Sequence, residues 1–138
     1  MSERSLTGGC QCGFVRFAVQ GDPLFAAICH CTMCRRASAA PAVAWAMFPE
    51  SSFKSLASDP AQYNSSAAAR RYFCPRCGTQ IAFRADFIPG LVDITLGSLD
   101  DPNAINPSLH YWYSKHLSWF ECEDELPKHA ELPPVGEG

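Results

Sequence analysis

Three observations predict an all-β fold for this chain. Short segments alternate apolar and polar residues, as at 14–20 (FVRFAVQ), where Val15, Phe17 and Val19 share one face. Proline, glycine, serine and aspartate separate these segments. No run of ten residues has the apolar spacing of an amphipathic helix. The chain has 138 residues, enough to bury a core as one domain, so we expect a single unit.

The expected strands follow one another with short connections. After the strand at 14–20, the turn GDP leads into a strand at 24–29. A short helical turn is predicted at 32–38, capped by Thr32 and ended by Pro41. The remaining strands are equally short and are expected at 42–48, 53–56, 61–65, 70–73, 79–85, 91–97 and 109–113. We place the domain at 8–127, with terminal extensions at 1–7 and 128–138, and expect the polar, Pro-rich end of the chain to lie loosely on the surface.

Charge and composition exclude several classes of function. The formal net charge is -3 and the pI is near 5.7, and the Lys and Arg residues are scattered, so we expect no nucleic-acid partner. The first nine residues contain no apolar core of a secretion signal, and the longest apolar runs are too short to span a membrane. We therefore expect a cytoplasmic protein, a monomer or homodimer, with no membrane partner.

The chain contains eight cysteines, and their spacing favours metal binding. In a reducing compartment thiols seldom persist as disulfides, so closely spaced cysteines are more often metal ligands or catalytic groups. Cys10 and Cys12 are too close along the chain to form a disulfide easily, and the same holds for Cys29 and Cys31.

The segment 73–81 (FCPRCGTQI) predicts one half of a closed zinc site. A proline after Cys74 fixes the turn, and Gly78 accepts the left-handed backbone that follows Cys77. Such a turn presents two thiolates, and a closed tetrahedral zinc site needs two more ligands. The candidates are Cys10 with Cys12, or two members of the cluster Cys29, Cys31 and Cys34.

We prefer the pair Cys10 and Cys12, because the glycines of GGCQCG would let this loop wrap an ion closely. This partition uses both two-cysteine loops and leaves the three-cysteine loop whole. It would tie the N-terminal strand to the middle of the chain. The alternative is a site made from Cys31, Cys34, Cys74 and Cys77.

Cys29, Cys31 and Cys34 predict a second, incomplete zinc site. Three thiolates fill three corners of a tetrahedron and leave one position for water or substrate. Three anionic sulfurs weaken the ability of zinc to polarise a carbonyl but suit it to hold and deprotonate a thiol, so we expect a thiol substrate. Alternatively, the cluster is reduced and metal-free, or it is closed into a second structural site by His30, His110, His116 or Cys122.

Several neighbouring residues have more than one interpretation. We expect His30 at the surface or beside the ligands and Cys122 as a lone thiol. Arg35 and Arg36 either bind substrate carboxylates or form a solvated pair of charges. The large aromatic residues are expected in the core: Trp45, Trp112, Trp119, Phe73 and Phe83.

Five segments together resemble the glutathione-dependent formaldehyde-activating enzyme family, whose domain also occurs in centromere protein V. In matching order from about Gly8 to Pro127 they are GGCQCGFVRF, CHCTMCRRASAAP, FCPRCGTQI, LVDITLGSLDDP and HYWYSKHLSW. The resemblance implies a β-tent, in which antiparallel sheets are organised around a structural zinc. It implies that Cys10, Cys12, Cys74 and Cys77 hold this zinc, and that Cys29, Cys31 and Cys34 hold a catalytic zinc.

The resemblance also implies a carbon-sulfur lyase-like enzyme. Such an enzyme joins glutathione, or another small thiol, to formaldehyde or a related aldehyde, and glutathione with formaldehyde gives S-hydroxymethylglutathione. Arg35, Arg36 or Lys115 would then hold the carboxylates of the peptide thiol. The alternative is a non-enzymatic zinc-binding module that docks a protein partner or buffers thiols or metal.

Overall fold

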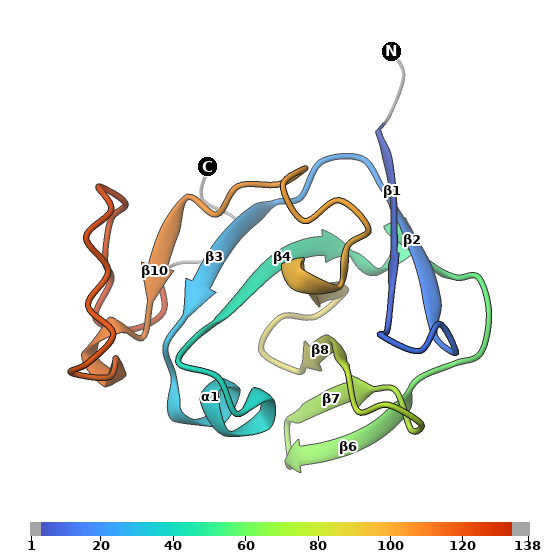
Figure 1. Cartoon of the computed structure of the whole chain (residues 1–138), viewed down its shortest axis with the longest axis horizontal. Coiled ribbons are helices and arrows are strands. Elements are labelled where there is room, and N and C mark those ends of the chain that lie inside the picture. Colours follow the sequence, from blue (N-terminus) through green and yellow to red (C-terminus); the bar gives the residue numbers. More distant parts are fainter. Residues whose placement is uncertain (1–3, 134–138) are drawn as a thin grey trace.

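The computed structural model describes residues 4–133, which form two β-sheets (Figure 1). The smaller sheet has the strand order β1-β2-β5, with β1 at Ser5–Gly9, β2 at Arg16–Gln20 and β5 at Phe53–Ser55. The larger sheet has seven strands in the order β10-β3-β4-β9-β8-β7-β6. In chain order these are β3 (Phe25–Cys29), β4 (Val43–Pro49), β6 (Ala61–Ser66), β7 (Ala69–Phe73), β8 (Gln80–Ala85), β9 (Leu91–Thr95) and β10 (Leu109–Tyr111). All neighbouring strands are antiparallel except β10 and β3, which are parallel.

The all-β prediction is confirmed, and each expected strand overlaps an observed one. The strand that the sequence did not predict is β1, whose glycines were assigned to a metal-binding loop. Gly8 pairs with Phe17 of β2 and also bridges to Leu99. A Cβ atom on Gly8 would lie 2.5 Å from the carbonyl oxygen of Ser98, so this close approach between backbones requires glycine.

The predicted helical turn is α1 (Thr32–Ser38), but its cap is Cys31 and not Thr32. The Sγ atom of Cys31 accepts a hydrogen bond from the Cys34 amide at 3.2 Å, as a serine or aspartate at this position would. Thr32 is already the first helical residue. Three short 3-10 helices complete the fold: η1 (Glu50–Ser52), η2 (Leu96–Ser98) and η3 (Tyr113–Lys115).

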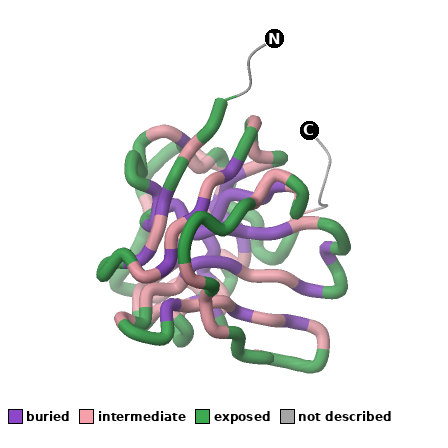
Figure 2. Tube along the Cα trace, turned by 90° about the vertical axis from the view of Figure 1, so that its right-hand side faces the viewer, coloured by how far each residue is buried: buried purple, intermediate pink, exposed green. Residues whose placement is uncertain are grey.

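The larger sheet separates two apolar regions because successive side chains of a strand point to opposite faces. In β4, Ala46 and Phe48 enter the main core, which also contains Phe17 of the smaller sheet. Trp45 and Met47 lie on the opposite face of β4 and belong to two smaller clusters. Figure 2 shows the buried residues concentrated in the interior strands, with exposed residues in the connections. The sheet therefore has a second apolar face, on which a cavity forms.

The C-terminal segment is hydrogen-bonded to the edge strand β10 of the larger sheet and to the residues that follow it. Backbone amides of His110, Tyr113 and Ser114 donate to the carbonyl oxygens of Pro127, His129 and Ala130, at 2.8 to 3.2 Å. The expectation of a loose tail is therefore wrong for this part of the chain, and residues 134–138 lie outside the described residues. Within the described part of the chain, no helix has the length and apolar character needed to cross a bilayer.

Candidate metal centres

Two loops bring Cys10, Cys12, Cys74 and Cys77 together, as the preferred partition predicted. Their sulfur atoms lie within 4.8 Å of one another. Cys12 Sγ is 3.6 Å from Cys10 Sγ and 3.8 Å from Cys74 Sγ. The first loop precedes β2 in the smaller sheet, and the second connects β7 to β8 in the larger sheet. Four thiolates at this spacing match the donor set of a closed zinc site, so this group could hold an ion that joins the two sheets.

Hydrogen-bond donors in the turn after β7 stabilise the thiolate forms of its two cysteines. The amides of Arg76 and Cys77 donate to Cys74 Sγ at 3.3 and 3.4 Å. Gly78 has a φ of +82°, the left-handed conformation predicted for the residue after the second ligand. The pKa of Cys77 is lowered to about 5, first because the Thr79 hydroxyl, 3.3 Å away, donates to its sulfur, and second because of the Thr79 amide. These donors stabilise thiolates, which are the form that binds metal.

Cys29, Cys31 and Cys34 form a separate group, with sulfur atoms within 4.8 Å of one another. Cys29 is the last residue of β3, Cys31 caps α1, and Cys34 lies within the first turn of that helix. Cys29 and Cys34 are buried, whereas Cys31 is partly exposed. This group could hold a metal ion with three protein ligands.

The three thiols influence one another strongly. The pKa of Cys31 is lowered because the thiols of Cys29 and then Cys34 donate to its sulfur. The pKa of Cys29 is raised, first by its hydrogen bond with Cys31. Arg71 Nη2 donates to Cys34 Sγ at 3.7 Å, so one cation lies directly against the group. The first thiolate therefore forms at Cys31, the most accessible of the three sulfurs.

Among residues 4–133, no further Cys, His, Asp or Glu donor lies within 4.8 Å of all three of these sulfurs. His30 is fully buried, so the expectation of a surface position is wrong. Its Nε2 atom is 2.9 Å from His110 Nδ1, and His110 Nε2 is 2.8 Å from a carboxylate oxygen of Asp124. Burial, and secondly the neighbouring His110, lowers the pKa of His30 to about 4. His30, His110 and Cys122 form their own group of potential ligands and do not close the three-cysteine group.

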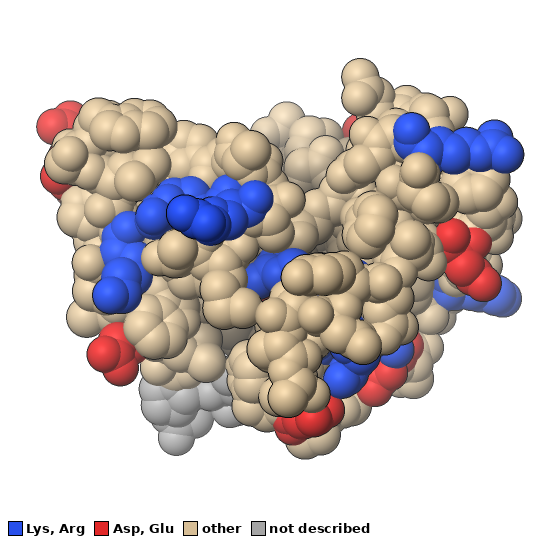
Figure 3. All heavy atoms as spheres, turned by 90° about the horizontal axis from the view of Figure 1, so that it is seen from below, with Lys and Arg blue, Asp and Glu red and all other residues tan. Residues whose placement is uncertain are grey.

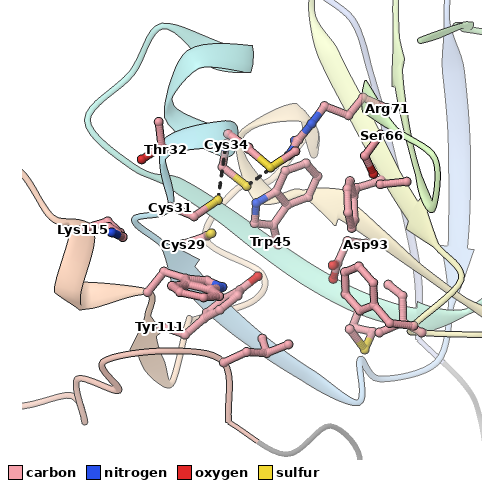
Figure 4. A pocket seen from close by; sticks show the side chains of 18 of the residues that line it. Cys29, Cys31, Thr32, Cys34, Trp45, Ser66, Arg71, Asp93, Tyr111 and Lys115 are labelled. Atoms are coloured by element: carbon pink, nitrogen blue, oxygen red, sulfur yellow. Dashed lines mark hydrogen bonds between the residues drawn. The ribbon is translucent and has the colours of Figure 1, made fainter. Parts of the chain in front are cut away.

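The three-cysteine group lines a cavity of about 570 Å³ (Figure 4). The rest of the wall comes mainly from the second apolar face of the larger sheet. Trp45 and Phe83, expected only in the core, face this cavity, together with Met47. Trp119, also expected in the core, is 70% exposed at the surface. The structure therefore places an apolar ligand-sized space directly beside the three thiols.

The three residues expected to hold substrate carboxylates are not gathered at this cavity. Lys115 lines it and is exposed. Arg35 Nη1 instead donates to the carbonyl oxygens of Lys115 and His30, at 2.8 and 3.3 Å. Arg36 is exposed and lines two other surface hollows. Figure 3 shows one face of the molecule, on which Lys and Arg lie in separate groups divided by neutral surface.

Three polar residues of the cavity wall were not predicted from the sequence, namely Arg71, Asp93 and Tyr111, and Trp112, expected in the core, also lines the cavity. Asp93 is buried in β9, and desolvation raises its pKa to about 7. A signal was present, because Asp93 interrupts the apolar run of that strand. Trp112 has a φ of +55°, an unusual conformation for a bulky residue, and is held in it between β10 and η3.

Comparison with known proteins agrees with this arrangement. Residues 5–115 match the family model described as "Glutathione-dependent formaldehyde-activating enzyme". The fold also resembles a crystal structure of a Rhodobacter sphaeroides protein from a structural genomics programme, with a TM-score of 0.60 and 23% identity. That match covers 74% of this chain and 92% of the other. No match was found among curated proteins. Because the family model spans most of the sequence, including both cysteine groups, the chain belongs to the glutathione-dependent formaldehyde-activating enzyme family.

Proposed function

We propose that this protein is a zinc-dependent enzyme that forms and cleaves carbon-sulfur bonds in the cytoplasm. It adds a small thiol, such as glutathione, to formaldehyde or a related aldehyde, and it reverses that addition. The difference between the two cysteine groups carries this proposal. Four thiols could surround one ion, whereas the other three thiols line a cavity and would leave one position of a bound ion for a ligand.

Zinc held by Cys29, Cys31 and Cys34 would supply the open position at which an incoming thiol binds and loses its proton. The hydrogen bond from the Cys34 amide holds Cys31 Sγ in place at the cavity wall. Arg71 lies against Cys34 Sγ and offsets part of the negative charge of the three sulfurs.

The reaction is an addition in which the thiol sulfur forms a bond to the carbonyl carbon. The thiol loses one proton, and the carbonyl oxygen takes up one proton and becomes a hydroxyl. The reaction therefore neither releases nor consumes a proton overall. We assign the donation to the carbonyl oxygen to Tyr111, which then regains the proton that the thiol released. It pairs with Cys29 across β10 and β3, and its hydroxyl points into the cavity (Figure 4). Burial raises the pKa of Tyr111, so the phenol stays protonated and can donate to the developing oxyanion.

Exchange NMR between formaldehyde and S-hydroxymethylglutathione tests this proposal on the zinc-loaded protein. We expect exchange faster than the uncatalysed rate. Cys31→Ser should abolish the enhancement, whereas Cys122→Ser, which removes a thiol outside both groups, should preserve it. Tyr111→Phe should slow exchange without changing the zinc content. The proposed activity would be refuted if the exchange rate stayed at the uncatalysed value at high enzyme concentration, with two zinc ions bound per chain.

A second candidate is a non-enzymatic zinc module that docks a protein partner. It is favoured by Trp119, which is 70% exposed, and by the neighbouring exposed Phe120. Trp119 lines a surface hollow with Pro41 and Leu117. If docking is the function, Cys31→Ser should leave partner binding intact, and Trp119→Ser should abolish it.

A further inference from the structure

The cavity beside the three-cysteine group is lined mainly by apolar side chains. Aromatic and aliphatic side chains from several strands form most of its wall: Phe25, Trp45, Met47, Phe83, Ile88 and Trp112. The backbones of β3, β4, β9 and β8 are already paired with one another, so they offer the ligand few free hydrogen-bonding groups. The binding free energy of a ligand in this cavity would come mainly from the removal of apolar surface from water.

The charges around the cavity do not suit a peptide with two carboxylates. Such a ligand needs cationic partners when it leaves water. Lys115 is the exposed cation in the wall, and Arg35 is engaged by backbone carbonyls. Arg71 lies inside the wall, with its guanidinium 4.9 Å from the ring centroid of Phe83. Its Nη1 atom has no hydrogen-bond partner among residues 4–133 and is closed off from solvent, so a ligand carboxylate would not reach it.

Asp93 is the polar group at the other end of the cavity. Along β4, Val43 pairs with Cys29 and Met47 pairs with Asp93. These two positions lie on the same face of the strand, and four residues of a strand span about 13 Å. Trp45 lies on the same face between these positions, and Figure 4 shows its ring between Cys29 and Asp93. Among residues 4–133, the Asp93 carboxyl forms no hydrogen bond with another side chain, so it is free to bind a ligand.

We propose that the preferred thiol substrate carries an aromatic or similarly large apolar group, with a hydrogen-bond donor directed at Asp93, and that a peptide thiol with two carboxylates, such as glutathione, binds more weakly. This inference rests on the proposed function for the position of the sulfur. The thiol lies at the three cysteines, the apolar group packs on Trp45 and Phe83, and the donor meets Asp93. The unusual backbone of Trp112 fits this role, because strained residues persist where they shape a binding site.

Isothermal titration calorimetry of the zinc-loaded protein, without aldehyde, tests the ligand class. The probes are 4-(2-sulfanylethyl)phenol, 2-phenylethanethiol and glutathione. We expect both aromatic thiols to bind at least about tenfold more tightly than glutathione, because each buries a ring. The phenol should bind more tightly than 2-phenylethanethiol, and Asp93→Leu should remove that difference. Tyrosol, which has no thiol, should bind the metal-free protein and so report on the cavity alone.

Two matched variants separate the cavity from the rest of the surface. Ser66 is exposed and lines the cavity, so Ser66→Trp should narrow it and weaken both aromatic thiols by about tenfold or more. Ser51→Trp introduces the same side chain at an exposed serine outside the cavity and should have no effect. Lys115→Ala should also leave aromatic thiol binding unchanged.

The opposite pattern would overturn the inference. Glutathione would bind as tightly as the aromatic thiols, would depend on Lys115, and would be insensitive to Ser66→Trp. Failure of the proposed function looks different, because it appears in the NMR exchange experiment and not in binding. If aromatic thiols bind as expected but neither they nor glutathione exchange faster with formaldehyde in the NMR experiment, the inferred ligand class is supported and the proposed enzymatic activity is refuted.

Discussion

Replacing Asp93 with asparagine should stabilise the protein in a pH-dependent manner. Asp93 is only 7% exposed, and burial raises its pKa from 3.8 to about 7. Between these two values the unfolded chain has lost the proton while the folded state still holds it. The folded state therefore loses stability as the pH rises from about 4 to about 7, and the full cost persists above that range. Asparagine stays neutral and avoids this cost.

The magnitude follows from the two pKa values. Each pKa unit corresponds to about 1.4 kcal/mol, so the total cost above pH 7 is on the order of 4 kcal/mol. Between pH 5.5 and 7, the stability advantage of Asp93→Asn should grow by about 2 kcal/mol and then level off. Because zinc binding depends on pH equally in both proteins, its effect cancels in the difference.

Urea unfolding of the zinc-loaded proteins, measured from pH 5.5 to 8.5, provides the test. Asp59→Asn changes an exposed aspartate outside the cavity and is the control, with no pH-dependent gain expected. If the difference between Asp93→Asn and the original protein is the same at every pH, Asp93 is not desolvated as described. The apolar character assigned to this end of the cavity would then be wrong.

Three further perturbations test the fold around the site. Cys77→Ser removes one of the four sulfurs that could hold an ion between the two sheets. Native mass spectrometry should then show one zinc fewer, and the melting temperature should fall sharply. Cys122→Ser should leave the zinc content and the melting temperature unchanged. Gly8→Ala places a Cβ atom 2.5 Å from a backbone oxygen and should lower the free energy of unfolding by about 1–3 kcal/mol, and an unchanged melting temperature would contradict this. Asp100→Asn should destabilise at pH 7, because the hydrogen bond from Arg16 lowers the pKa of Asp100 from 3.8 to about 2. This stabilisation is lost as the pH falls through that range, so the two proteins should converge in acid, and a constant difference would refute the assignment.

Local patterns in the sequence determined the elements and the ligand pairs. Alternation along a strand is a property of adjacent residues, so segments such as 14–20 and 79–85 were predictable without knowing their partners. The spacing of Cys74 and Cys77 likewise defines one turn, because its hydrogen bonds lie within a few residues. The glycines of GGCQCG favoured pairing this turn with Cys10 and Cys12, and the resemblance to a family implied the same pairing.

The tertiary structure decided what surrounds the three-cysteine group. Arg71, Phe83, Asp93 and Met47 come from four strands and form one row only because the strand register aligns them. His30 lies between two cysteines in the sequence, yet its side chain points to His110, since neighbouring residues of an extended chain face opposite ways. Strand register, and the face of the sheet on which each side chain lies, depend on pairing between distant segments. A short stretch of sequence does not specify that pairing. The sequence alone could therefore identify the thiols, but only the fold shows that they face an apolar cavity ending in a buried carboxyl group.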